Sequence, residues 1–157
     1  MAETSTELIS LNALVIDDSR VMRNMVMQAL RQSNLANFEF IEAGNGSEGL
    51  GKFDADKINI IFVDWNMPGM DGIEFARQIR AMPWAKDIPI VMITSETGAD
   101  RQQNAYDKAR ITCYVTKPFT AEEIESKIGP VIANLKGKGE KTGAPKASNG
   151  FFSKLLG

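Results

Sequence analysis

Polar side chains that could carry phosphate or metal chemistry stand at the ends of four short apolar runs. They are Asp17 and Asp18 after the run 11–16, Asp64 after 58–63, Thr94 after 88–93 and Lys117 after 111–116. Apolar runs of this length and β-branched content are typical of strands buried on both faces of a parallel sheet. Ligands of open α/β sheets bind beyond the carboxyl ends of the strands, so we expect these side chains to share one site.

The residue types in this set favour phosphoryl transfer to a carboxylate. Three Asp side chains gathered at one edge would repel one another unless a cation lay among them. The chain has no His and a single Cys, and oxygen ligands without imidazole or thiolate favour Mg²⁺. A carboxylate beside Mg²⁺ can attack phosphorus to form an acyl phosphate, and the Thr94 hydroxyl and Lys117 ammonium would bind the phosphoryl oxygens. We take Asp64, which precedes a loop rich in Pro and Gly, as the reactive carboxylate.

Strand-like and helix-like segments alternate along the chain, and this predicts an α/β fold. The expected strands are 11–16, 38–41, 58–63, 88–93 and 111–116, and a helical segment follows each of them. This (βα)5 alternation predicts a doubly wound, five-stranded parallel sheet with helices on both faces. Thr120 and Glu123 form a capping box for the last helix. We expect Gly129-Pro130 to interrupt that helix and to kink or loosen it near Ser126.

The strand-end residues, in this order, resemble the receiver domain of two-component response regulators. The runs 64–72 (DWNMPGMDG) and 117–120 (KPFT) look especially like the single-domain chemotaxis regulators of the CheY type. The resemblance covers about residues 10–135. It implies a flavodoxin-like strand order of 2-1-3-4-5 and phosphoryl transfer from a histidine kinase to Asp64. The lack of His agrees with this, since the donor imidazole must then come from another protein.

The resemblance also implies roles for single residues. The implied Mg²⁺ ligands are Asp17, Asp18, Asp64 and the backbone carbonyl of Asn66. Thr94 and Lys117 would bind the phosphoryl group. Tyr114, three residues before the lysine, resembles the aromatic residue that switches together with Thr94. Such a protein is not an enzyme acting on other substrates, since it catalyses only its own phosphorylation and dephosphorylation.

The implied partners are a CheA-like sensor histidine kinase and a downstream protein such as a flagellar motor switch or a phosphatase. Output in chemotaxis and a place as an intermediate phosphoacceptor in a phosphorelay both remain open. A haloacid-dehalogenase-like phosphatase would use similar groups, but it places the paired acids late in the chain and carries Asp-x-Asp at the nucleophile. Here the nucleophile reads Asp64-Trp65-Asn66 and the acid pair comes first. Turnover of a phosphate ester would separate that enzyme from a signalling protein.

Composition divides the chain into one domain with terminal segments. We expect an N-terminal arm over 1–10, a receiver domain over 11–135, a flexible linker rich in Gly and Lys over 136–150, and an apolar docking peptide over 151–157. The apolar residues of the last segment share one face of a short helix, and they are Phe151, Phe152, Leu155 and Leu156. So short a helix is marginal alone and would need a surface to dock on, in cis or in trans.

Bulk composition excludes several classes of protein. Apolar residues make up 43% of the chain, enough for one core, but no apolar run is long enough to span a membrane. The first residues lack the features of a signal peptide, and the single Cys113 excludes an internal disulfide. Lysines concentrate after residue 135, so the main body is acidic, which argues against nucleic-acid binding. We expect a cytoplasmic monomer without membrane association.

Overall fold

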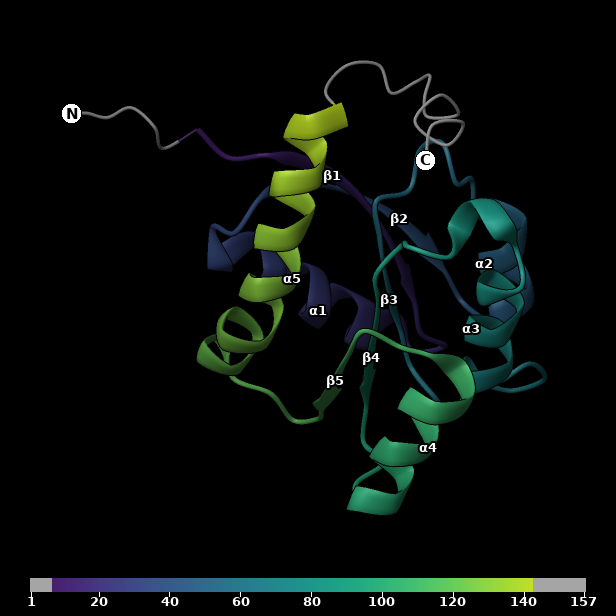
Figure 1. Ribbon diagram of the computed structural model, residues 1–157. Coiled ribbons are helices and arrows are strands. Elements are labelled where there is room, and N and C mark those ends of the chain that lie inside the picture. Colours follow the sequence, from purple (N-terminus) through teal and green to yellow (C-terminus); the bar gives the residue numbers. More distant parts are fainter. Residues whose placement is uncertain (1–6, 143–157) are drawn as a thin grey trace.

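The computed structural model describes residues 7–142, with side chains placed as far as residue 137. Strands and helices alternate throughout this part of the chain (Figure 1). The elements are β1 (Ser10–Ile16), α1 (Arg20–Ser33), β2 (Asn37–Ala43), α2 (Gly46–Lys52), β3 (Ile60–Val63), α3 (Gly72–Arg80), the short 3-10 helix η2 (Pro83–Ala85), β4 (Ile90–Thr94), α4 (Ala99–Ala109), β5 (Cys113–Thr116) and α5 (Ala121–Thr142).

The five strands form a single sheet in the order β2-β1-β3-β4-β5, and all neighbouring strands are parallel. This confirms the predicted α/β fold and its flavodoxin-like strand order. The register pairs Ile16 with Val63 and Thr94 with Thr116, so the carboxyl ends of these strands lie at one edge. The strand-end side chains are therefore delivered to a common place.

Two helical layers cover the sheet, and each has its own apolar core (Figure 1). Helices α1 and α5 pack on one face, where Leu30 and Ile124 are fully buried. Helices α2, α3 and α4 cover the other face, where Phe75 and Ile79 are fully buried. The sheet is thus covered on both sides, and its edge at the strand ends is the part left open to ligands.

Strand β3 is the centre of the sheet, and every one of its residues is buried. Ile60 and Phe62 point into the core under α1 and α5, whereas Ile61 and Val63 point into the opposite core. Burial of each side chain stabilises the fold by about 1.5–3 kcal/mol. The strand is therefore held firmly from both faces, and so is Asp64, the residue that follows it.

Helix caps set where the helices next to the strand ends begin. The Ser19 hydroxyl accepts a hydrogen bond from the backbone N–H of Met22 at 3.1 Å, which starts α1 directly after the acid pair. The predicted capping box of α5 is also present. The Glu123 N–H donates to the Thr120 hydroxyl at 3.1 Å, and the Thr120 N–H donates to the Glu123 carboxylate at 2.9 Å.

Helix α5 differs from the prediction, because it runs from Ala121 to Thr142 with Pro130 inside it. The predicted interruption is therefore wrong. Pro130 cannot donate to the Ser126 carbonyl, which costs about 3 kcal/mol. Ile128 and Ile132, on either side of the proline, are buried at 0% and 4% exposure, and together they contribute at least as much as that cost.

The predicted start of the linker is also wrong, since residues 136–142 continue α5. The apolar pattern used to end the domain stops at Leu135, and Gly137 and Gly139 disfavour a helix, so local propensity does not account for the continuation of α5. At the other end, β1 begins at Ser10, one residue before the expected domain boundary. The rest of the linker and the proposed docking peptide, with Phe151, Phe152, Leu155 and Leu156, lie outside the described residues.

Within residues 7–142, no helix has the length and apolar character needed to cross a membrane.

Candidate functional site

Three carboxylates converge where β1 and β3 end. One oxygen from each of Asp17, Asp18 and Asp64 lies within 4.8 Å of the others. Asp17 and Asp64 are buried, at 4% and 8% exposure, whereas Asp18 is exposed to solvent. The register of the sheet produces this arrangement, because the Asp64 N–H donates to the Ile16 carbonyl at 3.0 Å. The predicted acid cluster is therefore present.

Lys117 is the cation of this cluster. Its Nζ atom lies 3.0 Å from Asp17 Oδ2 and 3.2 Å from Asp64 Oδ2, and its side chain is only 14% exposed. The backbone N–H of Lys117 donates to the Thr94 carbonyl at 2.8 Å, so β4 fixes where the side chain begins. One ammonium, paired with two of the three carboxylates, leaves the cluster with a net negative charge, and oxygen donors in that state suit a divalent cation.

Backbone groups hold the carboxylates in fixed orientations. The Ser19 N–H donates to Asp17 Oδ1 at 2.9 Å, and the Trp65 N–H donates to Asp64 Oδ1 at 2.7 Å. Both donors belong to the short loops that follow β1 and β3. The remaining oxygens of Asp17 and Asp64 are the ones that face Lys117, which leaves the open side of the cluster toward Asp18 and solvent.

Gly72 is a residue whose importance at this site was not predicted. A Cβ atom at this position would lie 2.2 Å from the Asp64 carbonyl oxygen and 2.9 Å from Trp65 Cα. The first turn of α3 can therefore press against the backbone of Asp64 only because residue 72 has no side chain. In the sequence, Asp71-Gly72 is typical of an ordinary loop before a helix, and the close approach becomes evident only from the packing.

Thr94 and Tyr114 meet at the loop between β4 and α4. The fully buried Thr94 accepts a hydrogen bond from the Glu96 N–H at 3.3 Å through its Oγ1 atom. The Tyr114 hydroxyl donates to the Glu96 carbonyl at 2.8 Å, and the ring is 2% exposed. Burial raises the pKa of the Tyr114 hydroxyl, and the nearby Glu96 charge raises it further. Both predicted switch residues are thus bonded to one loop residue.

Glu96 also links the mouth of the site to α4, a contact that sequence reasoning missed. Asn66 Nδ2 donates to Glu96 Oε2 at 2.5 Å, and Arg101 Nε lies 3.6 Å from Glu96 Oε1. The Arg101 guanidinium stands over the Trp65 ring, 5.1 Å from its centroid. Asn66 was predicted to contribute its backbone carbonyl to a metal, and that assignment stays a prediction. No local pattern pointed to Glu96 or Arg101, because their contacts join separate loops.

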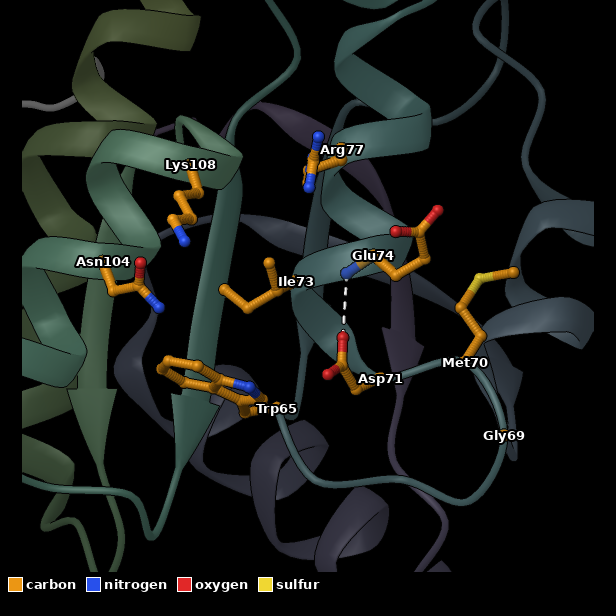
Figure 2. A pocket seen from close by; sticks show the side chains of 9 residues that line it. All are labelled: Trp65, Gly69, Met70, Asp71, Ile73, Glu74, Arg77, Asn104 and Lys108. Atoms are coloured by element: carbon orange, nitrogen blue, oxygen red, sulfur yellow. Dashed lines mark hydrogen bonds between the residues drawn. The ribbon is translucent and has the colours of Figure 1, made fainter.

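A cavity of about 390 Å³ lies beside the site, between α3 and α4 (Figure 2). Figure 2 shows Trp65 at one side of it, Ile73 in the middle, and the cationic side chains of Arg77 and Lys108 at the other side. Asp17, Asp18 and Asp64 do not line this cavity. The acid cluster therefore lies at the open sheet edge and not in the cavity.

Comparisons with known proteins agree with this geometry. The family model for the response regulator receiver domain matches residues 13–129. The chain is 38% identical over 120 residues to the chemotaxis protein CheY1 of Helicobacter pylori strain J99, covering 76% of this chain and 94% of that protein. It is 34% identical over 124 residues to the chemotaxis protein CheY of Pseudomonas aeruginosa, covering 79% of this chain and 98% of that protein.

Solved structures give the same result. The chemotaxis protein CheY4 of Vibrio cholerae superposes with a TM-score of 0.66 at 32% identity, over 74% of this chain and 94% of that one. A CheY-like receiver domain protein from Methanospirillum hungatei gives a TM-score of 0.69 over 82% of this chain and 98% of that one. At 20% identity, it supports the fold alone.

Proposed function

The chain belongs to the response regulator receiver family, and from this membership we propose that Asp64 accepts a phosphoryl group from a histidine kinase in a Mg²⁺-dependent reaction. The observation that carries the proposal is the cluster of Asp17, Asp18 and Asp64 around the Lys117 ammonium. Proteins of this family are signalling switches.

The chemistry assigned to Asp64 is attack by a carboxylate oxygen on phosphorus. The bond from phosphorus to the imidazole nitrogen of the kinase breaks, an acyl phosphate forms on Asp64, and the imidazole leaves with the electron pair of the broken bond. The Lys117 ammonium already contacts Asp64 and can pair with the phosphoryl oxygens. It would therefore stabilise the negative charge on these oxygens during the transfer. Thr94 lies at the same edge and would donate its hydroxyl to one of those oxygens.

The donor set supports Mg²⁺ as the cofactor. Three carboxylates, of which Asp18 is exposed, provide hard oxygen ligands and an open side from which the ion and a phosphate can enter. Asp17, Asp18 and Asp64 would hold the ion, with the Asn66 carbonyl as a further ligand. When bound, Mg²⁺ would neutralise charge on the carboxylates and on the phosphoryl group.

The switch that we propose runs from Thr94 to Tyr114. Both side chains bond to the backbone of Glu96, so movement of Thr94 toward a phosphoryl group would pull on the contact of the tyrosine hydroxyl. The surface that would change on phosphorylation is then the one around α4, because Glu96 and Arg101 connect this helix to the site. This gives a two-state element that phosphorylation can bias.

We infer that the output is binding of a partner in chemotaxis signalling, in the cytoplasm. The support is that curated relatives at 34% and 38% identity are named chemotaxis proteins and are covered over 94–98% of their length. A CheA-like kinase would then be the donor, and a motor switch or a phosphatase would be the receiver of the signal. The residues 151–157 are proposed to dock on a partner or on the domain itself.

Mass spectrometry of the intact chain with acetyl phosphate tests the phosphorylation proposal. The wild type should gain one phosphoryl group in Mg²⁺ and none in excess EDTA, and Asp64→Asn should gain none. Asp71→Asn is the matched control, because Asp71 only caps α3 in the same loop and should leave uptake intact. Uptake by Asp64→Asn at the wild-type rate would overturn the proposal.

Binding assays test the output. With phosphorylated chain, a motor-switch peptide should bind more tightly than with unphosphorylated chain, and removal of residues 151–157 should weaken the contact if the tail docks in trans. A chain that passes its phosphoryl group to a histidine phosphotransfer domain, without binding the peptide, would instead be a phosphorelay intermediate.

A further inference from the structure

Arg23 of α1 reaches back to the end of β1. Its Nη1 atom donates to the backbone carbonyl of Asp17 at 2.6 Å, and its Nε atom donates to Glu42 Oε1 on β2 at 2.9 Å. The side chain is only 15% exposed. The guanidinium therefore links α1, which carries it, to the acid pair after β1 and to the edge strand β2.

Several groups contact Asp17, and among the described residues only Arg23 donates a hydrogen bond to its backbone carbonyl. The Asp17 N–H donates to the Ala43 carbonyl at 3.2 Å, while the side-chain oxygens are held by Ser19 and Lys117. The carbonyl belongs to the peptide that links Asp17 to Asp18. Arg23 is thus the side chain that fixes this peptide.

Asp18 depends on that peptide for its position. Its side chain is exposed, and among the described residues no hydrogen bond to its carboxylate is found. A carboxylate without partners keeps its place beside Asp64 only through the backbone that carries it. Loss of the Arg23 contact would allow the peptide to rotate and the carboxylate oxygens to spread.

We propose that Arg23 is a positioning residue for the divalent-cation site, acting through the Asp17–Asp18 peptide. This inference rests on the proposed function, since it assumes that the acid cluster binds Mg²⁺. Arg23 does not touch the cation or the phosphoryl group. Its role is to keep the Asp17 and Asp18 carboxylates at the separation that the ion requires. Residues that contact metal ligands from outside the coordination sphere commonly have this role.

The chemistry of the contact explains why the residue must be arginine. A guanidinium presents several donors in a rigid plane, so Glu42 can orient it through Nε while Nη1 bonds the carbonyl. A lysine has a single ammonium on a flexible stem and cannot reproduce this fork. Glu42 makes no hydrogen bond to the Asp17–Asp18 peptide itself and acts by orienting the guanidinium plane of Arg23.

Isothermal titration of the full chain with Mg²⁺ tests the proposal. Substitution of residues that support metal ligands typically lowers metal affinity about 10- to 100-fold. Arg23→Lys should therefore bind Mg²⁺ about tenfold more weakly than the wild type, and Glu42→Gln should show a smaller loss of affinity. Arg31→Lys is the matched control. It lies on the same helix, where its guanidinium stacks on Phe40 at 4.8 Å, and should bind as the wild type does.

Phosphorylation kinetics separate positioning from a merely structural role. Arg23→Lys should need about tenfold more Mg²⁺ for half-maximal uptake from acetyl phosphate and should approach the wild-type rate when Mg²⁺ is saturating. A structural defect would lower the melting temperature without changing the Mg²⁺ affinity of the folded protein. Wild-type affinity in Arg23→Lys overturns this inference alone, whereas absence of Mg²⁺ binding by the wild type overturns the proposed function.

Discussion

Lys117 provides the positive charge that lets Asp17 and Asp64 remain buried together. A buried carboxylate that loses its cation is strongly disfavoured, and here one ammonium serves two of them. The same ammonium competes with any metal ion for these oxygens. Under the proposed function, Lys117 would therefore oppose cation binding slightly while it prepares the site for an incoming phosphoryl group.

This balance predicts opposite effects for Lys117→Met. Mg²⁺ should bind more tightly, because the carboxylates lose a competing cation, whereas uptake of phosphate should slow by about a hundredfold, as for loss of one charge-stabilising donor. Titration calorimetry and the initial rate of uptake measure the two effects. Lys108→Met, on α4 beside the cavity, should change neither. A joint loss of affinity and rate in Lys117→Met would contradict this role.

The absence of a side chain at residue 72 is a second requirement at the residue scale. In Gly72→Ala the new methyl group would overlap the Asp64 carbonyl, and relief of such overpacking costs about 1–3 kcal/mol. We expect a lower melting temperature and slower phosphate uptake, because the backbone of Asp64 must move. Gly51→Ala in α2 meets nothing within 4 Å and should be neutral or stabilising by about 0.5–1 kcal/mol. Equal effects of the two substitutions would show that the close approach does not matter.

At the scale of elements, α4 is attached to the core by small side chains alone. Only Ala105 and Ala109 of this helix are buried, in agreement with the few apolar anchors in its sequence. Its N-terminal half is tied to the site by Arg101, which contacts Glu96 and the Trp65 ring. A segment that buries only small side chains and is otherwise held by polar contacts has low local stability. It can therefore shift between two states.

Arg101→Gln should therefore loosen the first half of α4. An exposed ion pair and a cation–π contact are together worth about 1 kcal/mol, so hydrogen exchange over residues 99–104 should quicken by about fivefold, with little change in α3. Lys108→Gln, on the same helix but without those contacts, is the control. Unchanged exchange in Arg101→Gln would mean that the alanine anchors alone hold the helix.

The elements also show where sequence patterns succeed and fail. Apolar runs identified β3 and β4, and the capping-box residues identified the start of α5. The continuation of α5 through Pro130 was not predicted, because it depends on Ile128 and Ile132 packing against the rest of the domain. Local propensity does not contain that information.

At the scale of the whole molecule, parallel pairing explains why the site could be expected from sequence. Once the strands are parallel, Asp17, Asp64 and Lys117 must lie at one edge whatever the lengths of the helices. The positions of Arg23, Gly72 and Glu96 could not be expected in the same way. Their contacts depend on distances between elements of separate chain segments, which only the packed structure provides.

Binding of Mg²⁺ should be visible as stability of the whole domain. A ligand present at a hundred times its dissociation constant stabilises the folded state by about 2.7 kcal/mol, which raises the melting temperature of a domain this size by about 5–10 °C. Differential scanning calorimetry of the wild type with Mg²⁺ and with EDTA measures the shift. Asp18→Asn should lose most of it, and Asp71→Asn should retain it. A shift of equal size in Asp18→Asn would argue against the carboxylate cluster as the binding site.

The central claim is that the carboxylate at residue 64 becomes an acyl phosphate. The most direct measurement is to phosphorylate the chain with acetyl phosphate and Mg²⁺, reduce the acyl phosphate with borohydride, digest the protein and locate the modified residue by peptide mass spectrometry. We predict that the aspartate at position 64 is reduced to homoserine and that no other acidic residue is. Reduction at a different residue, or an unmodified residue 64 in a chain that has taken up phosphate, would contradict the account.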